Sequence, residues 1–300
     1  MATRTDYFKL HFIVFLWGFS GILGKLISIP AYELVFFRTL LASFGIGIVL
    51  LLTRETFRVS LKQFGSLIGI GFIVAVHWVA FFEAARVSNV SVSLVGFATN
   101  SLWTALLDPL FNKTTLKKFE LLLGLLVIFG LYVIFSFEFR YPLGLMLGVL
   151  SGFTSALFSV FNARLVRNIP AFTISFYEMI GAFVGLTIFF PIYRITWSAD
   201  GIYHLSPGMM DWIYLIVLTG ACSVYAYTTA VELMKKVSVF LIQLTLNLEP
   251  VYGIIMAVII FGAEEKMGLK FYVGTLIILS AVASYPFLKR KADARVIVNP

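Results

Sequence analysis

The chain has 300 residues, of which 60% are hydrophobic and 13% are charged, and its mean hydropathy is +0.96. These values exceed what a soluble domain of this length needs for its core, so they exclude a soluble globular protein. The net charge of +8 does not indicate a nucleic-acid partner, because the basic residues cluster in short connections between apolar runs. We therefore predict an all-α integral membrane protein whose helices satisfy their own backbone polar groups.

Prolines, charge clusters and polar turns divide the chain into ten apolar stretches that are long enough to span a bilayer as helices. In chain order the predicted transmembrane helices are 8–28, 31–53, 62–86, 88–112, 117–137, 142–168, 171–195, 208–236, 237–262 and 269–290. Placing both termini in the cytoplasm puts most of the 23 basic residues on the cytoplasmic side. This asymmetry favours an even number of spans with both termini inside.

Two pairs of similar segments show that the chain contains an internal repeat. The segments "SIPAYELVFFRTLLASFGIG" (28–47) and "NIPAFTISFYEMIGAFVGLT" (168–187) align without gaps and share Ile-Pro-Ala, a Phe, an Ala and a Gly. Residues 81–107 align in the same way with residues 230–256, which pairs Asn100 with Glu249. The spacing between the members of a pair is 140 residues in the first case and 149 in the second.

The repeat predicts two five-helix halves, 1–138 and 139–300. Because five is an odd number of spans, the second half begins on the opposite side of the membrane, and the two halves are inverted. Two inverted repeats are a common plan of transporters, which bind solute near the bilayer midplane between the halves.

At this point the sequence resembles a known family. Trp17-Gly18, "PAYELVFFRTLLA" after position 29, and "LEPVYGIIMAVIIFGAE" ending at Glu264 are similar to the EamA-type branch of the drug/metabolite transporter superfamily. The resemblance implies a multi-pass transporter of the bacterial inner membrane, of the kind that exports amino acids, metabolites or drugs. The first half departs from the family pattern, since Asn100-Ser101 stands where many members have a second acid-proline pair.

Polar and aromatic side chains near the middle of the spans predict a solute cavity. An ionisable group at the bilayer centre costs about 2.5 to 3.5 kcal/mol on insertion scales, so we give it a functional interpretation first. Glu249 lies roughly 18 Å along its predicted helix, near the midplane. The predicted cavity residues are Trp17, His77, Asn100, Trp103, Glu249 and Tyr252. Pro250 is predicted to kink the helix and free backbone polar groups.

Each of these residues also has a purely structural interpretation. The aromatic side chains also suit ordinary packing or an interfacial belt. His77 also suits a buried neutral imidazole, and Glu249 a hydrogen-bonded carboxylate beside the kink.

A second set of charged residues lies nearer the two surfaces. We predict an outer cluster of Arg38 and Glu83 with Arg86, and an inner cluster of Glu178 and Glu232 with Lys235. Ion pairing within each cluster would close one side while the other side opens. The alternative is that these side chains snorkel to the interface as anchors, which fits Arg86 and Lys235 best.

Small residues at four-residue spacing predict close helix packing. They are Gly144, Gly148, Gly152, Gly181 and Gly185. Whether these glycines face another helix or another subunit is left open by the pattern.

The absence of other motifs in the sequence limits the function further. There is no phosphate-binding GxxxxGK[ST] loop and no protease or hydrolase motif, so we predict neither ATP hydrolysis nor an enzyme. The lone Cys222 excludes a cysteine metal site, and we predict no cofactor or metal.

The predicted partners are a small-molecule substrate and membrane lipids. The substrate gradient, or protons acting through Glu249 or His77, would drive transport. A membrane enzyme acting on a lipid-like substrate and a non-transporting receptor are the alternatives.

Overall fold

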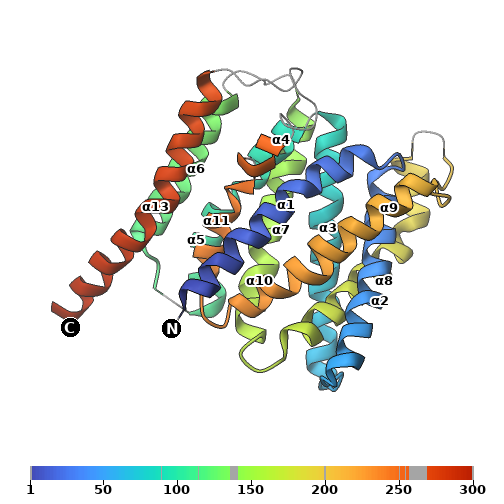
Figure 1. Ribbon diagram of the computed structural model, residues 1–300, viewed down its shortest axis with the longest axis horizontal. Helices are drawn as coiled ribbons and strands as arrows, with labels where there is room; N and C mark the ends of the chain where they lie inside the picture. The colour runs from blue at the N-terminus through green and yellow to red at the C-terminus, as the bar shows by residue number, and fades with distance from the viewer. Residues whose placement is uncertain are drawn as a thin grey trace.

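The computed structural model describes residues 2–88, 90–113, 115–135, 141–198, 201–249, 251–253, 255–256 and 269–298. Within these residues the secondary structure is helical and includes no β-strand (Figure 1). The first half contains α1 (Arg4–Leu26), α2 (Ala31–Thr53), α3 (Leu61–Val87), α4 (Val90–Phe97), α5 (Asn100–Asn112) and α6 (Lys118–Phe135). The second half contains α7 (Pro142–Leu165), α8 (Ala171–Thr196), α9 (Met209–Val217), η1 (Leu218–Tyr227), α10 (Thr228–Leu233), α11 (Val239–Leu246) and α13 (Leu269–Val298).

Length and hydropathy single out seven helices, among the described residues, that can cross a membrane. They are Arg4–Leu26, Ala31–Thr53, Leu61–Val87, Pro142–Leu165, Ala171–Thr196, Met209–Leu233 and Tyr272–Ala292. The prediction of an all-helical membrane protein is therefore confirmed, whereas the count of ten spans stays a prediction.

The two Ile-Pro-Ala segments start helices at matching positions, as the repeat predicts. Pro30 and Pro170 are the N-caps of α2 and α8, with φ angles of −56° and −57°. Proline lacks an N–H group, so a helix start is a position where it breaks no helical hydrogen bond.

Two predicted helices are interrupted at equivalent points of the repeat. α4 ends at Phe97 and α5 begins at Asn100, with a two-residue turn between them. α11 ends at Leu246 and is followed by a turn at residues 247 and 248. The 149-residue spacing of the repeat superimposes one break on the other. The predicted kink residue, Pro250, lies outside the described residues, and this break precedes it.

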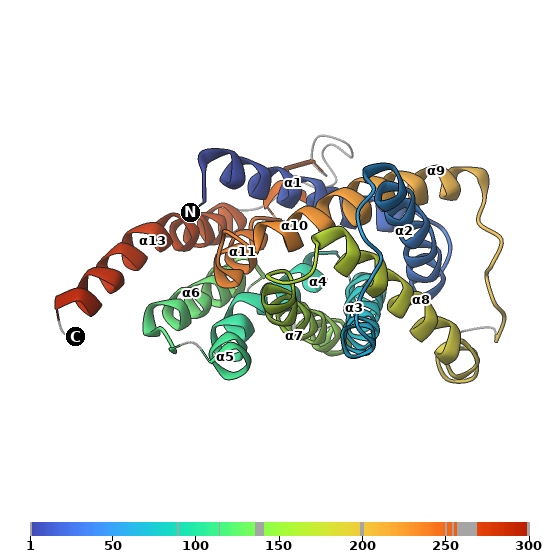
Figure 2. The same ribbon diagram turned by 90° about the horizontal axis from the view of Figure 1, so that it is seen from below.

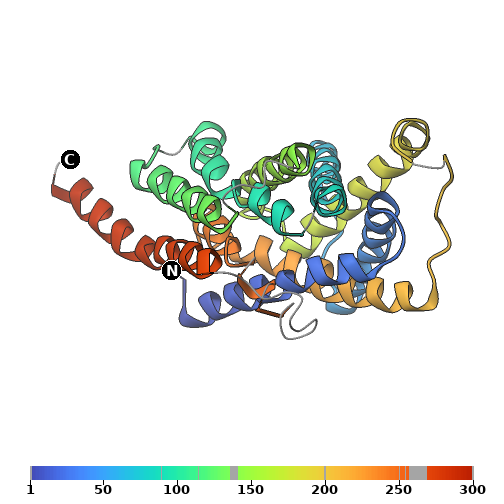
Figure 3. The same ribbon diagram turned by 90° about the horizontal axis from the view of Figure 1, so that it is seen from above.

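The two halves interlock rather than pack as separate bodies. α3 packs against α7 and α8, α1 against η1, α2 against α8, and α6 against α13. Figures 2 and 3 show α6 and α13 side by side at one end of the molecule and α2 with α8 toward the other end. The helices between these pairs, from both halves, surround the centre of the molecule.

Glycines allow the helices of opposite halves to approach closely. A Cβ atom at Gly71 of α3 would clash with the carbonyl oxygen of Glu178 in α8, and one at Gly181 would lie 2.5 Å from the carbonyl oxygen of Ile68. Gly96 and Gly148 meet in the same way between α4 and α7. The predicted glycine positions therefore face other helices of the same chain.

Candidate functional site

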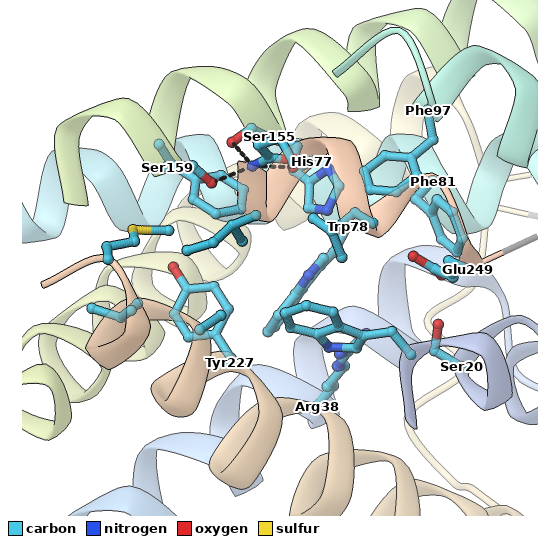
Figure 4. Close-up of a pocket in the computed structure, with 18 residues that line it drawn as sticks. Ser20, Arg38, His77, Trp78, Phe81, Phe97, Ser155, Ser159, Tyr227 and Glu249 are labelled. Atoms are coloured by element: carbon cyan, nitrogen blue, oxygen red, sulfur yellow. Dashed lines mark hydrogen bonds between the residues drawn. The ribbon is translucent and has the colours of Figure 1, made fainter. Parts of the chain in front are cut away.

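An internal cavity of about 70 Å³ lies where α1, α2, α3, α7, η1 and α11 meet. Figure 4 shows its labelled side chains converging from these helices, together with Phe97 at the end of α4 and Glu249 just after α11. Its polar lining residues are Ser20, Arg38, His77, Ser155, Ser159, Gln243 and Glu249. Its aromatic lining residues are Trp17, Trp78, Phe81, Phe97, Phe158 and Tyr227.

Arg38 supplies a buried positive charge to this cavity. Its side chain is 2% exposed, and its Nε donates a hydrogen bond of 2.7 Å to Ser223 Oγ. The guanidinium carbon lies 3.9 Å from the centroid of the Trp78 ring. The ring face and the hydroxyl replace part of the hydration that the guanidinium loses on burial, which makes its position in the membrane interior tolerable.

Glu249 supplies a buried carboxyl group to the same cavity. It is 5% exposed, and within the described chain its carboxylate forms no hydrogen bond or close ion pair. The carboxylate and the Arg38 guanidinium interact electrostatically. Because buried carboxylates are normally hydrogen-bonded, the free hydrogen-bonding capacity of Glu249 marks it as a group that can bind a ligand.

His77 also lines the cavity, and contacts with α7 hold its side chain in place. Its Nδ1 lies 2.9 Å from both the carbonyl oxygen and the Oγ of Ser151. The ring centroid lies 5.6 Å from that of Phe97 and 5.4 Å from that of Phe158. These contacts fix the imidazole and leave its Nδ1 engaged by α7.

The π-helix η1 supplies polar contacts around the cavity. The indole N–H of Trp17 donates to the Cys222 carbonyl oxygen at 3.0 Å, Arg38 donates to Ser223, and the Tyr227 hydroxyl donates to a carboxylate oxygen of Glu178 at 2.7 Å. π-Helical turns are rare and occur frequently at functional sites. Here the widened turn joins α1, α2 and α8 around one centre.

A polar stripe on α7 forms another wall. Ser151, Ser155, Ser159 and Asn162 follow one another at intervals of three or four residues and are at most 2% exposed. This spacing places them on one helical face. Gln243 Nε2 on α11 donates to Ser159 Oγ at 2.6 Å and to the Ser155 carbonyl oxygen at 3.3 Å.

The structure brings together some of the predicted cavity residues. Trp17, His77 and Glu249 line the cavity. Asn100, Trp103 and Tyr252 lie outside its described lining. Asn100 is fully buried at the start of α5, and the side-chain amide has no hydrogen-bond partner among the described residues.

The other two aromatic predictions pack against neighbouring helices. Trp103 packs edge-on against Phe153 of α7, and Tyr252 against Phe15 of α1. The turn after Phe97 redirects α5, so that Phe97 rather than Asn100 reaches the cavity. The roles assigned to all six residues stay predictions.

The four predicted gating residues lie in different surroundings, and their gating roles stay predictions. Arg38 lies in the central cavity. Glu83 accepts a hydrogen bond of 3.1 Å from the Trp197 indole. Glu178 is fully buried beside Tyr227, whereas Glu232 on α10 is exposed. On the side of the α10–α11 turn, the ion pair is between Lys236 and Asp6 at 3.1 Å.

Several cavity residues were absent from the sequence prediction. They include Trp78, Tyr227, Gln243, Ser155 and Ser159. The serines carry a readable signal, because polar residues at helical spacing in an apolar span indicate an inward face. Trp78 and Tyr227 carry no such signal in a chain with 16% aromatic residues.

The fold and the cavity define a multi-pass helical membrane protein with a polar, aromatic-lined interior. The profile of the EamA-like transporter family matches residues 7–136 and 142–285, so the chain belongs to this family and is a membrane transporter. The predicted resemblance to the drug/metabolite transporter superfamily is thereby confirmed. Transporters of this family act on small molecules in a lipid environment and are generally not enzymes.

Individual relatives agree with this assignment. The chain is 22% identical over 271 residues to the uncharacterized transporter YxxF of Bacillus subtilis (strain 168), covering 88% of this chain and 84% of the relative. A solved structure, described only as the crystal structure of a protein, superposes with a TM-score of 0.74. It is 17% identical and covers 97% of this chain and 99% of the other, which shows a shared fold.

Proposed function

We propose that this protein exports a small organic solute that carries both a positive and a negative charge, such as an amino acid. The observation that carries the proposal is the presence of Arg38 and Glu249 on the wall of one internal, aromatic-lined cavity. A solute carboxylate would bind the Arg38 guanidinium, and a solute ammonium would bind Glu249. The surrounding rings would supply apolar and cation–π contact.

Alternating access would carry the solute across the membrane. The cavity of about 70 Å³ is smaller than ordinary ligand pockets of about 300 to 1,000 Å³, so the helices must separate before an organic solute enters. The packing supports a movement of one half against the other, since α2 contacts its repeat mate α8 and α6 contacts its repeat mate α13. In this proposal ten spans form two inverted repeats, 1–138 and 139–300, with the solute between them.

The membrane orientation follows from the charge distribution. We place the protein in the bacterial inner membrane with both termini in the cytoplasm. The start of α1 and the end of α13 lie on the same side of the molecule in Figure 1, which supports this arrangement.

Counterflow in proteoliposomes tests the proposal. Vesicles loaded with an unlabelled amino acid mixture are diluted into labelled zwitterionic, cationic or anionic solutes, and transient accumulation is recorded. We expect accumulation of a zwitterionic solute by the wild type and much weaker, but measurable, accumulation of the same solute in Glu249→Gln. The matched control, Glu120→Gln on α6, removes a carboxylate that pairs with Lys117 outside the cavity and should retain counterflow. Absence of counterflow for every solute class would refute the proposal.

A further inference from the structure

A second buried carboxyl group lies beside the cavity and does not line it. Glu178 of α8 is 0% exposed. Its Oε2 accepts hydrogen bonds from the Tyr227 hydroxyl at 2.7 Å and from Asn162 Nδ2 at 3.2 Å. Its Oε1 is buried without a hydrogen-bond partner among the described residues. Both partners are neutral donors, so neither supplies a charge to balance a carboxylate.

The charged groups on the helices packed against α8 are bonded elsewhere or are exposed. On α2, Arg38 donates to Ser223, and Glu33 accepts from Tyr193. On α3, His77 bonds Ser151, Glu83 accepts from Trp197, and Arg86 donates to the carbonyl oxygens of Ile27 and Ile29. Lys62 at the start of α3 and Glu232 on α10 are exposed. Within the described chain, no cation forms an ion pair with Glu178.

We propose that Glu178, Tyr227 and Asn162 form a proton-binding site that is distinct from the solute-binding Glu249. An ionised carboxylate without a counter-ion is strongly disfavoured in a low-dielectric interior, whereas the protonated acid is neutral. The packed arrangement seen here is therefore the proton-loaded state. The unpartnered Oε1 is the atom that carries the proton.

The site is connected to the cavity by its own hydrogen-bond partners. Tyr227 lines the cavity and donates to Glu178, and Asn162 continues the α7 stripe three residues after Ser159, which also lines it. Separation of α7, α8 and α10 would admit water to Glu178. The O–H bond of the acid would then break, and its proton would pass to that water. Solute-driven opening would thus be coupled to proton release, a step that rests on the proposed transport function.

Infrared difference spectroscopy of the reconstituted protein tests proton binding without any solute. The pH is the only variable, and the carbonyl stretch of a protonated carboxyl group is recorded. We expect a band in the wild type that is missing in Glu178→Gln and present in Glu249→Gln. In Tyr227→Phe the band should persist at a changed frequency, because the carboxyl group has lost a hydrogen bond. Size-exclusion profiles that match the wild type show that the variants are folded.

The outcomes separate the proton site from the transport function. If the wild-type and Glu178→Gln spectra are identical at every pH, Glu178 binds no titrating proton and the inference is overturned, even if the protein transports solute. If the Glu178 band is present, the counterflow solute should drive proton movement in the wild type, and Glu178→Gln should retain counterflow with at least a tenfold loss of proton movement. Proton movement that persists unchanged in Glu178→Gln overturns the coupling role.

Discussion

At the scale of single residues, the two buried carboxyl groups at the cavity differ in their hydrogen-bond partners. Glu178 uses hydrogen bonds from two neighbours, whereas the Glu249 carboxylate has none among the described residues. The two carboxyl groups therefore differ in their surroundings, which is the basis for the two different roles proposed for them. Glu249 is available to a ligand, and Glu178 is built into the packing of α7, α8 and η1.

The Arg38–Trp78 contact leads to a first prediction. A cation–π contact contributes about 0.5 to 2 kcal/mol, so Trp78→Leu should weaken solute binding by roughly 2- to 30-fold. The measurement is the solute concentration for half-maximal counterflow. The control is Trp212→Leu, because Trp212 packs against Phe37 and does not line the cavity. Equal half-maximal concentrations for the wild type and Trp78→Leu would show that the ring does not hold Arg38 in a solute-binding position.

The candidate site could be predicted only in part from sequence. Glu249 and His77 are ionisable residues near the middle of apolar spans, so their cost in lipid identifies them. The depth of Arg38 along its helix predicts a position at the outer mouth, because the sequence does not show that η1 places Ser223 beside it. Symmetry with Glu249 predicts Asn100 in the cavity, whereas the structure buries it at the start of α5, outside the described cavity lining.

At the scale of helices, the sequence predicts the helix starts of the repeat better than the turns and the π-helix that interrupt the helices. Ile-Pro-Ala placed the starts of α2 and α8 correctly because proline restricts where a helix can begin. The turn at residues 98 and 99 has no proline or glycine, and the π-helix η1 has only one glycine, Gly220. Tertiary contacts, which are not encoded in a local pattern, decide these features.

Close packing between α3 and α8 leads to a second prediction. A methyl group at Gly71 would clash with the backbone of α8, so Gly71→Ala should destabilise the protein by about 1 to 3 kcal/mol, the usual range for overpacking. The measurement is the thermal midpoint in detergent. Gly69→Ala is the matched control on the same helix, because nothing lies within 4 Å of its added Cβ. Equal midpoints for the two variants would contradict the observed contact between α3 and α8.

At the scale of the whole molecule, composition determined the class of protein, and the repeat determined its plan. A chain with 60% hydrophobic residues needs a membrane, and the matched segments indicated two related halves. The way in which the halves interlock could not be predicted from the sequence. α3 packs against helices of the other half at glycines such as Gly71, but other glycines, such as Gly69, make no such contact.

The proposed orientation leads to a third prediction. Cys222 is buried, and a Cys222→Ala background leaves the chain without thiols. Single cysteines at the exposed positions Thr56 and Ser206 then report opposite sides of the membrane. In intact cells, a membrane-impermeant maleimide should label Ser206→Cys and not Thr56→Cys, and lysis should expose the second site. The reverse labelling pattern would contradict cytoplasmic termini.

The central claim is that Arg38 and Glu249 bind the two opposite charges of one solute. The most direct measurement is the inhibition of phenylalanine counterflow by two competing analogues. Phenethylamine lacks the carboxylate, and hydrocinnamate lacks the ammonium group. The account predicts that phenylalanine is strongly preferred by the wild type, that Arg38→Met loses the preference over phenethylamine, and that Glu249→Gln loses the preference over hydrocinnamate. Wild-type preferences that both variants retain would contradict the account.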